Sequence, residues 1–301
     1  MLTLLLTTLF AVPIGVELIA DPDFEQGFKV YDPKPGKQVV RRVLQWGHAA
    51  DTPVWGLAQW SSKHSLAETT LERLPSGTVR FADPAKTVTV GSRSEGTPRL
   101  SLALDGRAEW GTTARKPGEP WPHLLVSQRF SNDCPRLDAL TSLDFSVSAR
   151  LARSKRFEPQ GYDPHIHAAQ FLIFFTVQNL NRESPGYGDF LWLGVPVYDD
   201  RDRPELSIIG GDQDHGKLIY TPARADYTGG DITSGEWVTF AADLLPLARR
   251  ALAEAWQRGF LKDSQAVADY RLGGMNMGWE MTGSHLVEME IRDLGLRAIP
   301  R

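Results

Sequence analysis

Alternation of apolar and polar residues is the feature that most restricts how this chain can fold. From Leu143 to Leu151 every second residue is apolar, and Asp, Ser, Ser and Arg stand between them. Residues Met275–Met281 and Val287–Arg292 alternate in the same way. Successive side chains of a strand point to opposite faces. Each segment is therefore expected to form a strand with one apolar face against a core and the other face toward solvent or a groove.

A second kind of strand is predicted over residues 168–177, which read AAQFLIFFTV. This segment is apolar on both faces, as is typical of a central strand that is covered on both sides. Gln170 is the one strongly polar residue near its start.

One helix is predicted, in the last quarter of the chain. Asp243 can cap its N-terminus, and Pro246 is tolerated in its first turn. An apolar stripe through Leu245, Ala248 and Leu252 follows, and Gly259 is well placed to end the helix.

The fold class follows from these elements together. The 27 glycines and 20 prolines, spread along the chain, indicate many turns. Many short strands, one late helix and no alternation of strands with helices predict an all-β protein: an antiparallel two-sheet β-sandwich of jelly-roll type with one helix near the C-terminus. A chain of 301 residues can form one such unit. A separate N-terminal module ending near residue 100 is the alternative.

The N-terminus carries an apolar run, Leu2–Val12, of signal-peptide length and too short to span a bilayer. We interpret residues 1–20 as a signal peptide and residues 21–301 as a single β-sandwich domain, which predicts a secreted or periplasmic protein without a membrane span. A buried first strand is the alternative, because no basic residue precedes the run and no small-x-small cleavage site follows it.

Charge and missing motifs exclude several classes of function. There are 33 basic and 37 acidic residues and no basic block, so nucleic acid is a poor candidate partner. The sequence has no Gly-x-Ser-x-Gly, no phosphate-binding glycine loop and no His-Glu-x-x-His. The lone Cys134 excludes an internal disulfide and makes a poor nucleophile.

Metal binding is not required by any pattern. His165 and His167 would face the same way in a strand, and His215 could join them, but polar residues at a strand entrance explain the pair better. The acidic segments 198–202 and 212–214 offer oxygen ligands for calcium, and solvated turns explain them equally well. We therefore predict no metal and no cofactor, with calcium as an open possibility.

Glu280 is the first candidate catalytic group. It stands beside Trp279 in a strand of large apolar residues, and its side chain leaves the core face. If that face lines a concave sheet, partial burial would favour the protonated form that a general acid needs. A solvent-facing glutamate on a convex face is the alternative.

The segments from EWVTFAADLLPLARRALAEAWQRGFL to YRLGGMNMGWEMTGSHLVEMEIRDLGL resemble the end of glycoside hydrolase family 12 and related concanavalin A-like jelly rolls. The resemblance covers roughly residues 140–297. It implies that Glu280, in the Gly-x-Glu strand, is the acid/base. It also implies that the AAQFLIFF strand carries the nucleophile, but Gln170 stands there in place of a glutamate. An amide cannot form the glycosyl ester, so the retaining double displacement of the family cannot run unchanged.

Two hypotheses of function follow. The first is an exported glycoside hydrolase acting on a polysaccharide or oligosaccharide, with Glu280 as proton donor and a second carboxylate from Asp199, Asp212 or Asp189; a distant second carboxylate would favour inversion. Gln170, Trp192, Tyr198 and Tyr220 are the candidate substrate-binding residues, since aromatic rings suit the apolar faces of sugars. Trp46, Trp55 and Trp60 are interpreted as packing. The second hypothesis is a non-catalytic carbohydrate-binding protein with the same fold, which Gln170 favours. A lyase and an envelope interaction domain are further alternatives.

Overall fold

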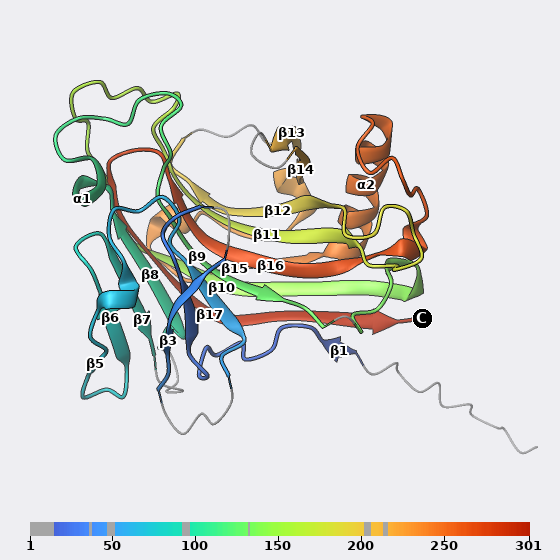
Figure 1. Cartoon of the computed structure of the whole chain (residues 1–301), viewed down its shortest axis with the longest axis horizontal. Helices are drawn as coiled ribbons and strands as arrows, with labels where there is room; N and C mark the ends of the chain where they lie inside the picture. Colours follow the sequence, from blue (N-terminus) through green and yellow to red (C-terminus); the bar gives the residue numbers. More distant parts are fainter. Residues whose placement is uncertain are drawn as a thin grey trace, which may run out of the picture.

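The computed structural model describes residues 15–35, 38–46, 52–91, 97–131, 133–201, 206–212 and 216–301. Two sheets face each other in it (Figure 1). Sheet A contains, in spatial order, β15 (Val238–Asp243), β10 (Leu140–Arg156), β17 (His285–Pro300), β8 (Leu100–Asp105), β7 (Lys86–Val90), β6 (Val79–Ala82) and β5 (Glu72–Arg73), with β1 (Val16–Glu17) paired to β17. Sheet B contains β13 (Ile208–Asp212), β14 (Lys217–Thr221), β12 (Phe190–Asp199), β11 (Ala169–Asn179), β16 (Tyr270–Met281), β9 (His123–Arg129), β4 (Trp55–Ala58), β2 (Phe28–Tyr31) and β3 (Val40–Leu44). The predicted all-β, two-sheet sandwich is confirmed.

The predicted alternation sets the core between the sheets. Leu143, Phe145, Val147 and Ala149 are buried on β10, and every second residue of β16 from Met275 to Met281 is buried with them. The pairs in both sheets are antiparallel except for β2 with β4 and β12 with β14, which are parallel. The strands of the first hundred residues enter both sheets, since β9 joins β4 and β2 to the middle of sheet B.

The segment predicted as a central strand is β11, which lies between β12 and β16. Phe171, Ile173, Phe175 and Val177 point into the core and are fully buried. The opposite face of β11 is half-buried rather than closed, at Gln170, Phe174 and Thr176. This face is covered only in part, so its side chains are available to a ligand.

The predicted helix is α2 (Leu244–Gln257). Asp243 caps it as expected, because its carboxylate accepts a hydrogen bond from the backbone N–H of Leu245 at 3.0 Å. The same carboxylate accepts the N–H of Leu143 at 2.9 Å, which ties the helix to β10. Gly259, with φ of 79°, follows the end of the helix. A five-residue helix, α1 (Gly106–Trp110), was not predicted. Within the described part of the chain there are also five short 3₁₀ turns: Leu66–Glu68, Leu137–Ala139, Arg224–Asp226, Ile232–Ser234 and Val267–Asp269.

Most of the predicted signal peptide, residues 1–14, lies outside the described residues, and the signal peptide stays a prediction. The last residues of this predicted segment, which are described from residue 15 on, contact the sandwich. Val16 and Glu17 pair with Ala298 and Arg297 of β17, and Ile19 is buried in the core. Among the described residues, no helix has the length and apolar character to cross a membrane.

Candidate functional site

Four polar side chains form one row across four neighbouring strands of sheet B, close to one end of each strand. Asp199 on β12 pairs with Gln170 on β11, Gln170 pairs with Glu280 on β16, and Glu280 pairs with His123 on β9. Residues paired directly across a sheet point to the same face. The next row along these strands, Tyr198–Phe171–Trp279–Leu124, is buried in the core between the sheets. The polar row therefore lies on the outer face of sheet B, which we call the groove face.

Glu280 is held loosely compared with the other carboxylates near it. The His123 ring lies beside it, with 3.8 Å between His123 Nε2 and Glu280 Oε2, and the Glu280 side chain is 24% exposed. No described residue donates a hydrogen bond to the Glu280 carboxylate. A half-buried carboxyl group without a fixed partner can exchange a proton with a bound molecule. The sequence-based expectation that Glu280 leaves the core face agrees with this position.

Gln170 and Asp199 form a fixed pair. The amide nitrogen of Gln170 donates to Asp199 Oδ2 at 2.7 Å. Arg201 binds the same carboxylate through Nε at 3.1 Å and Nη2 at 2.9 Å, and its backbone N–H donates to it at 2.9 Å. These bonds to Asp199 raise the pKa of the Arg201 guanidinium. The carboxylate of Asp199, 3% exposed, is thus committed to neighbours within the protein.

A second ionic group fixes the backbone under this row. Asp200 accepts hydrogen bonds from the N–H of Ala169 at 2.8 Å, from Arg156 Nη2 at 3.0 Å and from His285 Nε2 at 2.7 Å. Burial alone would raise the pKa of Asp200, but the hydrogen bond and charge of His285 and the other donors outweigh burial, and the pKa lies below its ordinary value. Asp200 thereby connects the start of β11 to the turn between β16 and β17.

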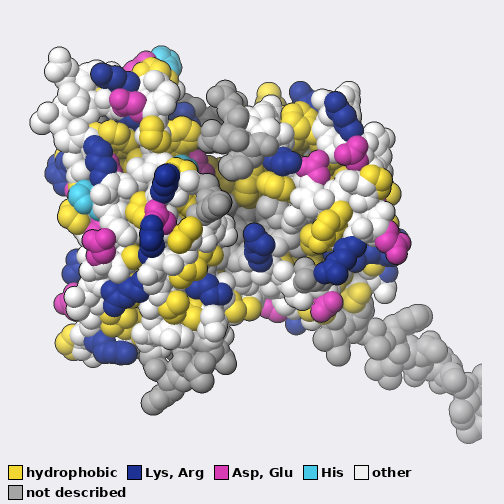
Figure 2. Space-filling view, in the orientation of Figure 1, with side chains coloured by type: hydrophobic (Ala, Val, Ile, Leu, Met, Phe, Trp, Pro, Cys, Tyr) yellow, Lys and Arg dark blue, Asp and Glu magenta, His cyan; other side chains and the backbone are white. Residues whose placement is uncertain are grey.

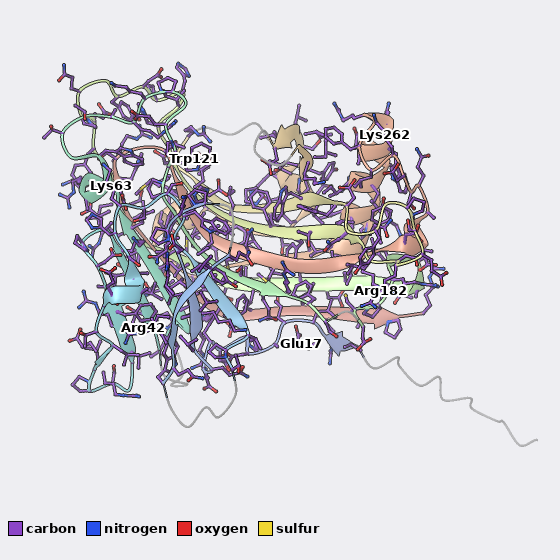
Figure 3. All side chains as sticks on the ribbon, viewed as in Figure 1. Glu17, Arg42, Lys63, Trp121, Arg182 and Lys262 are labelled. Carbon is purple, nitrogen blue, oxygen red and sulfur yellow. The ribbon has the colours of Figure 1, made fainter. Side chains whose placement is uncertain are left out.

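Aromatic rings lie on both sides of the polar row. Toward β14, the Trp192 ring lies 5.9 Å from Phe174 and 5.1 Å from Phe190, measured between ring centroids. On the other side, His123 lies 6.0 Å from Trp60 and 5.7 Å from Trp121. Figure 3 shows Trp121 where β11, β12 and β16 curve upward at one end of the sheets.

The molecule is hollowed along this face. Figure 2 shows a depression between the left and right parts of the molecule, over the place where Figure 1 has the middle of β11, β12 and β16, with hydrophobic side chains in it. Two aromatic rings pack closely over glycines of this sheet: the Tyr31 ring lies over Gly56 and the Phe174 ring over Gly194, so a Cβ at either position would collide with the ring. A smaller hollow adjoins the row beyond Asp199 and Arg201, between β12 and Tyr227.

Several polar atoms of this face have no partner within the described part of the chain. They are Nε1 of Trp60 and of Trp121, Nδ1 of His123 and Oδ1 of Asn276. Buried polar groups are normally hydrogen-bonded, so a cluster of unpaired donors and acceptors is typical of a surface that completes its bonds with water or a ligand.

The structure brings three of the predicted residues together and separates five others. Glu280, Gln170 and Asp199 share one row. Tyr198 instead points into the core, where it is 8% exposed and its hydroxyl contacts that of Ser154 at 2.8 Å, and burial raises its pKa. Tyr220 is 4% exposed and also belongs to the core.

Trp192 and Asp212 lie on the groove side but far from Glu280. The Trp192 indole N–H donates to Asp212 Oδ2 at 3.1 Å. Trp192 pairs with Thr176, which is about 20 Å along β11 from Gln170 at the usual strand rise. Asp189 lies farther still, beyond the end of β12, in an ion pair with Lys217 at 2.5 Å. Asp212 and Asp189 are thus not placed to act together with Glu280.

Sequence reasoning missed His123, Trp121 and Trp60 on this face, as well as Phe174, Phe190 and Asn276. Trp46, Trp55 and Trp60 were all predicted to be packing residues. Trp46 and Trp55 are indeed buried in the core, but Trp60 is half-buried and lies beside His123. His123 lies beside Glu280 because the Leu124–Phe130 strand pairs antiparallel with the Glu280 strand. Sequence periodicity alone does not show which strands pair, so no signal in the sequence identified His123.

The metal hypotheses find no support in the described residues. No group of three or more His, Cys, Asp or Glu among them could hold an ion. His167 accepts the N–H of Asp163 on Nδ1 and contacts the carbonyl of Arg115 through Nε2, so both ring nitrogens are used within the protein. His215 and residues 202 and 214 of the acidic segments lie outside the described residues.

No protein-family model and no curated protein matches the chain. Solved structures do. An endoglucanase Cel12A from Rhodothermus marinus has 11% identity over 77% of this chain and 97% of its own, with a TM-score of 0.41. A family 12 xyloglucanase from Bacillus licheniformis has 9% identity over 76% of this chain and 97% of its own, with a TM-score of 0.43. A family 11 xylanase from Neocallimastix patriciarum has 8% identity over 76% and 95%, with a TM-score of 0.35. The chain is thus similar, at low identity, to solved glycoside hydrolases of families 12 and 11, while the strand order itself shows the two-sheet β-sandwich.

Proposed function

We propose that this protein is a glycoside hydrolase that binds a polysaccharide or oligosaccharide along the groove face of sheet B, with Glu280 as its proton donor. The observation that carries the proposal is the row Asp199–Gln170–Glu280–His123 between two groups of aromatic rings. In that row Glu280 is the carboxyl group that lacks a hydrogen-bond donor among the described residues, and it is 24% exposed.

Each part of this face suits a sugar chain. Trp192, Phe174 and Phe190 offer apolar surface on one side of the row, and Trp60 and Trp121 on the other. Sugar rings present C–H faces that pack on such surfaces, while their hydroxyls need polar partners. Unpaired polar atoms on Trp60, Trp121, His123 and Asn276 supply donors and acceptors for those hydroxyls.

Glu280 would protonate the oxygen of the leaving sugar. Cleavage of a glycosidic bond requires an acid at this oxygen because an alkoxide is a poor leaving group. His123, with Nε2 3.8 Å from Glu280 Oε2, is placed to form a hydrogen bond with the leaving sugar.

A non-catalytic carbohydrate-binding protein is the second candidate, and a specific observation favours it. Asp199, the other carboxylate of the row, is engaged by Arg201 and Gln170 and is 3% exposed. Such a carboxylate is poorly placed to activate a water, as an inverting mechanism requires. Under either candidate we propose export from the cell, where polysaccharide substrates are found.

The test is a product-mass and reducing-end assay on a broad polysaccharide panel, with wild type, Glu280→Gln and Glu288→Gln compared. Glu288 is the matched control, because it lies on β17 in the other sheet and bonds Ser101. Cleavage by wild type and Glu288→Gln, reduced roughly 10³-fold in Glu280→Gln, supports a hydrolase. Retention on an insoluble glycan without cleavage supports the binding protein, and neither cleavage nor retention on any glycan contradicts both.

A further inference from the structure

We propose, resting on the proposed hydrolase function, that the substrate is a glycan of 2-acetamido sugars and that the acetamido group of the substrate acts as the nucleophile, in place of the carboxylate that Gln170 replaces. The observations are the amide at position 170 directly opposite Glu280 and the way Asp199 orients that amide.

Among the described residues of the groove face, no carboxylate beside Glu280 is placed to attack a sugar carbon. The residue of β11 that pairs with Glu280 is Gln170. A glutamine amide cannot form the covalent glycosyl ester that a carboxylate nucleophile forms. Asp199 lies one strand farther, about 10 Å from the Glu280 strand at the usual spacing, and is held by Arg201. Asp212 and Asp189 lie toward the other end of the groove, at Trp192 and Lys217.

Gln170 is oriented as an acceptor. Asp199 can only accept hydrogen bonds, so the amide nitrogen of Gln170 must face it, at 2.7 Å. The amide oxygen of Gln170 is left without a donor among the described residues. Hydrogen bonding to a carboxylate polarises an amide and makes its oxygen a stronger acceptor. The row therefore presents a polarised acceptor next to the proton donor Glu280, and an acetamido N–H is a donor that fits it.

The reaction balances with these groups alone. The acetamido oxygen forms a bond to the anomeric carbon as the bond to the leaving oxygen breaks, and Glu280 gives its proton to that oxygen. The resulting five-membered oxazolinium ring carries a positive charge that is shared by its N–H group. Gln170 Oε1 accepts a hydrogen bond from this N–H group. Water then loses a proton to Glu280 and attacks the anomeric carbon, and the electron pair of the ring bond returns to the acetamido oxygen. Two inversions give net retention, and substrate participation of this kind occurs in glycosidases without a protein nucleophile.

In this scheme Gln170 is a catalytic residue because its oxygen contacts the reacting group. Asp199 is a positioning residue that acts through Gln170, and Arg201 holds Asp199. The preference for 2-acetamido sugars would then be set by chemistry rather than by the shape of the groove.

The experiment compares three matched sets of β-1,4 oligosaccharides: N-acetylglucosamine oligomers, their de-N-acetylated forms and glucose oligomers, together with bacterial cell-wall glycan. We expect cleavage of acetamido substrates only, with retained anomeric configuration by NMR. A thiazoline analogue of N-acetylglucosamine, in which sulfur replaces the ring oxygen of the intermediate, is expected to inhibit at micromolar or lower concentration.

Variants separate catalysis from stability. Gln170→Ala is expected to reduce kcat on acetamido substrates about 10²-fold or more and to weaken thiazoline inhibition, with KM less affected. Gln178→Ala is the control on the same strand, since its amide donates to the carbonyl of Gly188 at 3.0 Å, away from the row.

Three results would overturn the inference. Cleavage of glucose or de-N-acetylated oligomers at rates equal to those of the acetamido forms leaves the hydrolase intact but removes the acetamido nucleophile. Inverted product configuration does the same. No cleavage of any glycan contradicts the hydrolase itself and this inference with it.

Discussion

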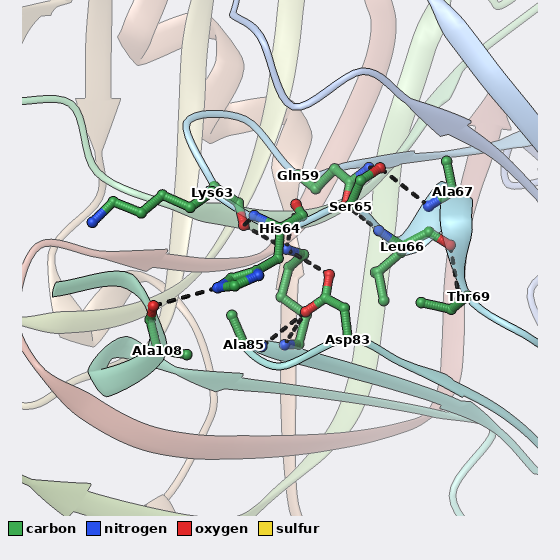
Figure 4. Close-up of polar contacts among 12 residues, drawn as sticks. Gln59, Lys63, His64, Ser65, Leu66, Ala67, Thr69, Asp83, Ala85 and Ala108 are labelled. Atoms are coloured by element: carbon green, nitrogen blue, oxygen red, sulfur yellow. Dashed lines mark hydrogen bonds and ion pairs between the residues drawn. The ribbon is translucent and has the colours of Figure 1, made fainter. Parts of the chain in front are cut away.

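The groove row and a buried charged cluster at one end of the sandwich each contain an aspartate and a glutamate, but the two regions hold these carboxylates differently. The cluster consists of Lys86, Asp83, Ser62 and Glu109. Lys86 Nζ lies 2.9 Å from Asp83 Oδ2 and donates to Ser62 Oγ at 2.5 Å, and Ser62 donates to Glu109 at 2.5 Å. Figure 4 shows the neighbouring contacts of Asp83, His64 and Gln59.

The two regions differ in whether their polar groups have partners within the protein. In the cluster Lys86 is 1% exposed and Glu109 2% exposed, and each charge meets an opposite charge or a hydrogen-bond partner. On the groove face, Glu280 and the amide oxygen of Gln170 have no donor among the described residues. Buried charges must be compensated within the protein, whereas a site for a ligand keeps groups that the ligand compensates. Compensation, rather than the presence of charge, separates the structural region from the candidate functional one.

Lys86→Met tests the structural side of this comparison and carries the largest expected effect on stability. Methionine keeps the length of the side chain, but Asp83 is left as an unpaired buried charge, so we expect the free energy of unfolding to fall by about 3–5 kcal/mol. Burial lowers the pKa of Lys86, and Asp83 offsets part of that lowering. Chemical denaturation of this variant beside Lys262→Met, at an exposed position on the far side of the molecule (Figure 3), measures the effect. Equal stability of the two variants would contradict the claim that Lys86 compensates the buried charge of Asp83.

Asp200→Asn tests the support under the row. We expect a loss of about 2 kcal/mol at pH 7, because hydrogen bonds from His285 and Arg156 to a charged group are lost. The folded pKa of Asp200 is depressed, so its contribution is present above the unfolded value of 3.8 and disappears as the pH falls through the folded pKa.

The denaturation curves of wild type and Asp200→Asn should therefore converge on acidification to pH 3 and below. Asp263→Asn, at an exposed position, is the control and should follow wild type throughout. A gap between wild type and Asp200→Asn that stays constant with pH would show that the charge of Asp200 does not contribute.

Trp192→Ala tests the aromatic surface and is expected to weaken glycan affinity about fivefold to tenfold, or roughly 1 kcal/mol, by titration calorimetry. Trp237→Ala is the matched control, because that ring packs under Arg292 at 4.1 Å beside sheet A. If both variants bind as well as wild type, the Trp192 surface takes no part in binding.

Glu280→Gln is expected to have the smallest effect on stability, within about 0.5 kcal/mol of wild type, because its carboxylate accepts no hydrogen bond from the described residues. Denaturant titration measures this. A loss above about 1.5 kcal/mol would move Glu280 to the structural class, together with Lys86.

Periodicity predicted the fold well because burial imposes it. The alternation at Leu143–Leu151 and Met275–Met281 gave the core face of β10 and β16, and the Asp243 cap gave the start of α2. Glu280 could be assigned to the outer face for the same reason. Tyr198 could not, because register shifts between Phe171 and Leu172 in the pairing of β11 with β12, and such an irregularity changes which side chains share a face.

The residues beside Glu280 could not be predicted from the sequence for another reason. Asp199, Gln170 and His123 come from three strands far apart in the sequence, and their pairing depends on sheet order. Trp121 lies in a proline-rich turn, where no period exists to show which way a side chain points.

The most direct test of the account is a crystal structure of Glu280→Gln soaked with the oligosaccharide that wild type cleaves or retains best. We predict a sugar chain along the groove face of sheet B, with the glycosidic oxygen within hydrogen-bonding distance of the residue 280 amide and rings packed on the aromatic groups beside it. A glycan bound at the outer face of sheet A, or anywhere else away from residue 280, would contradict the account.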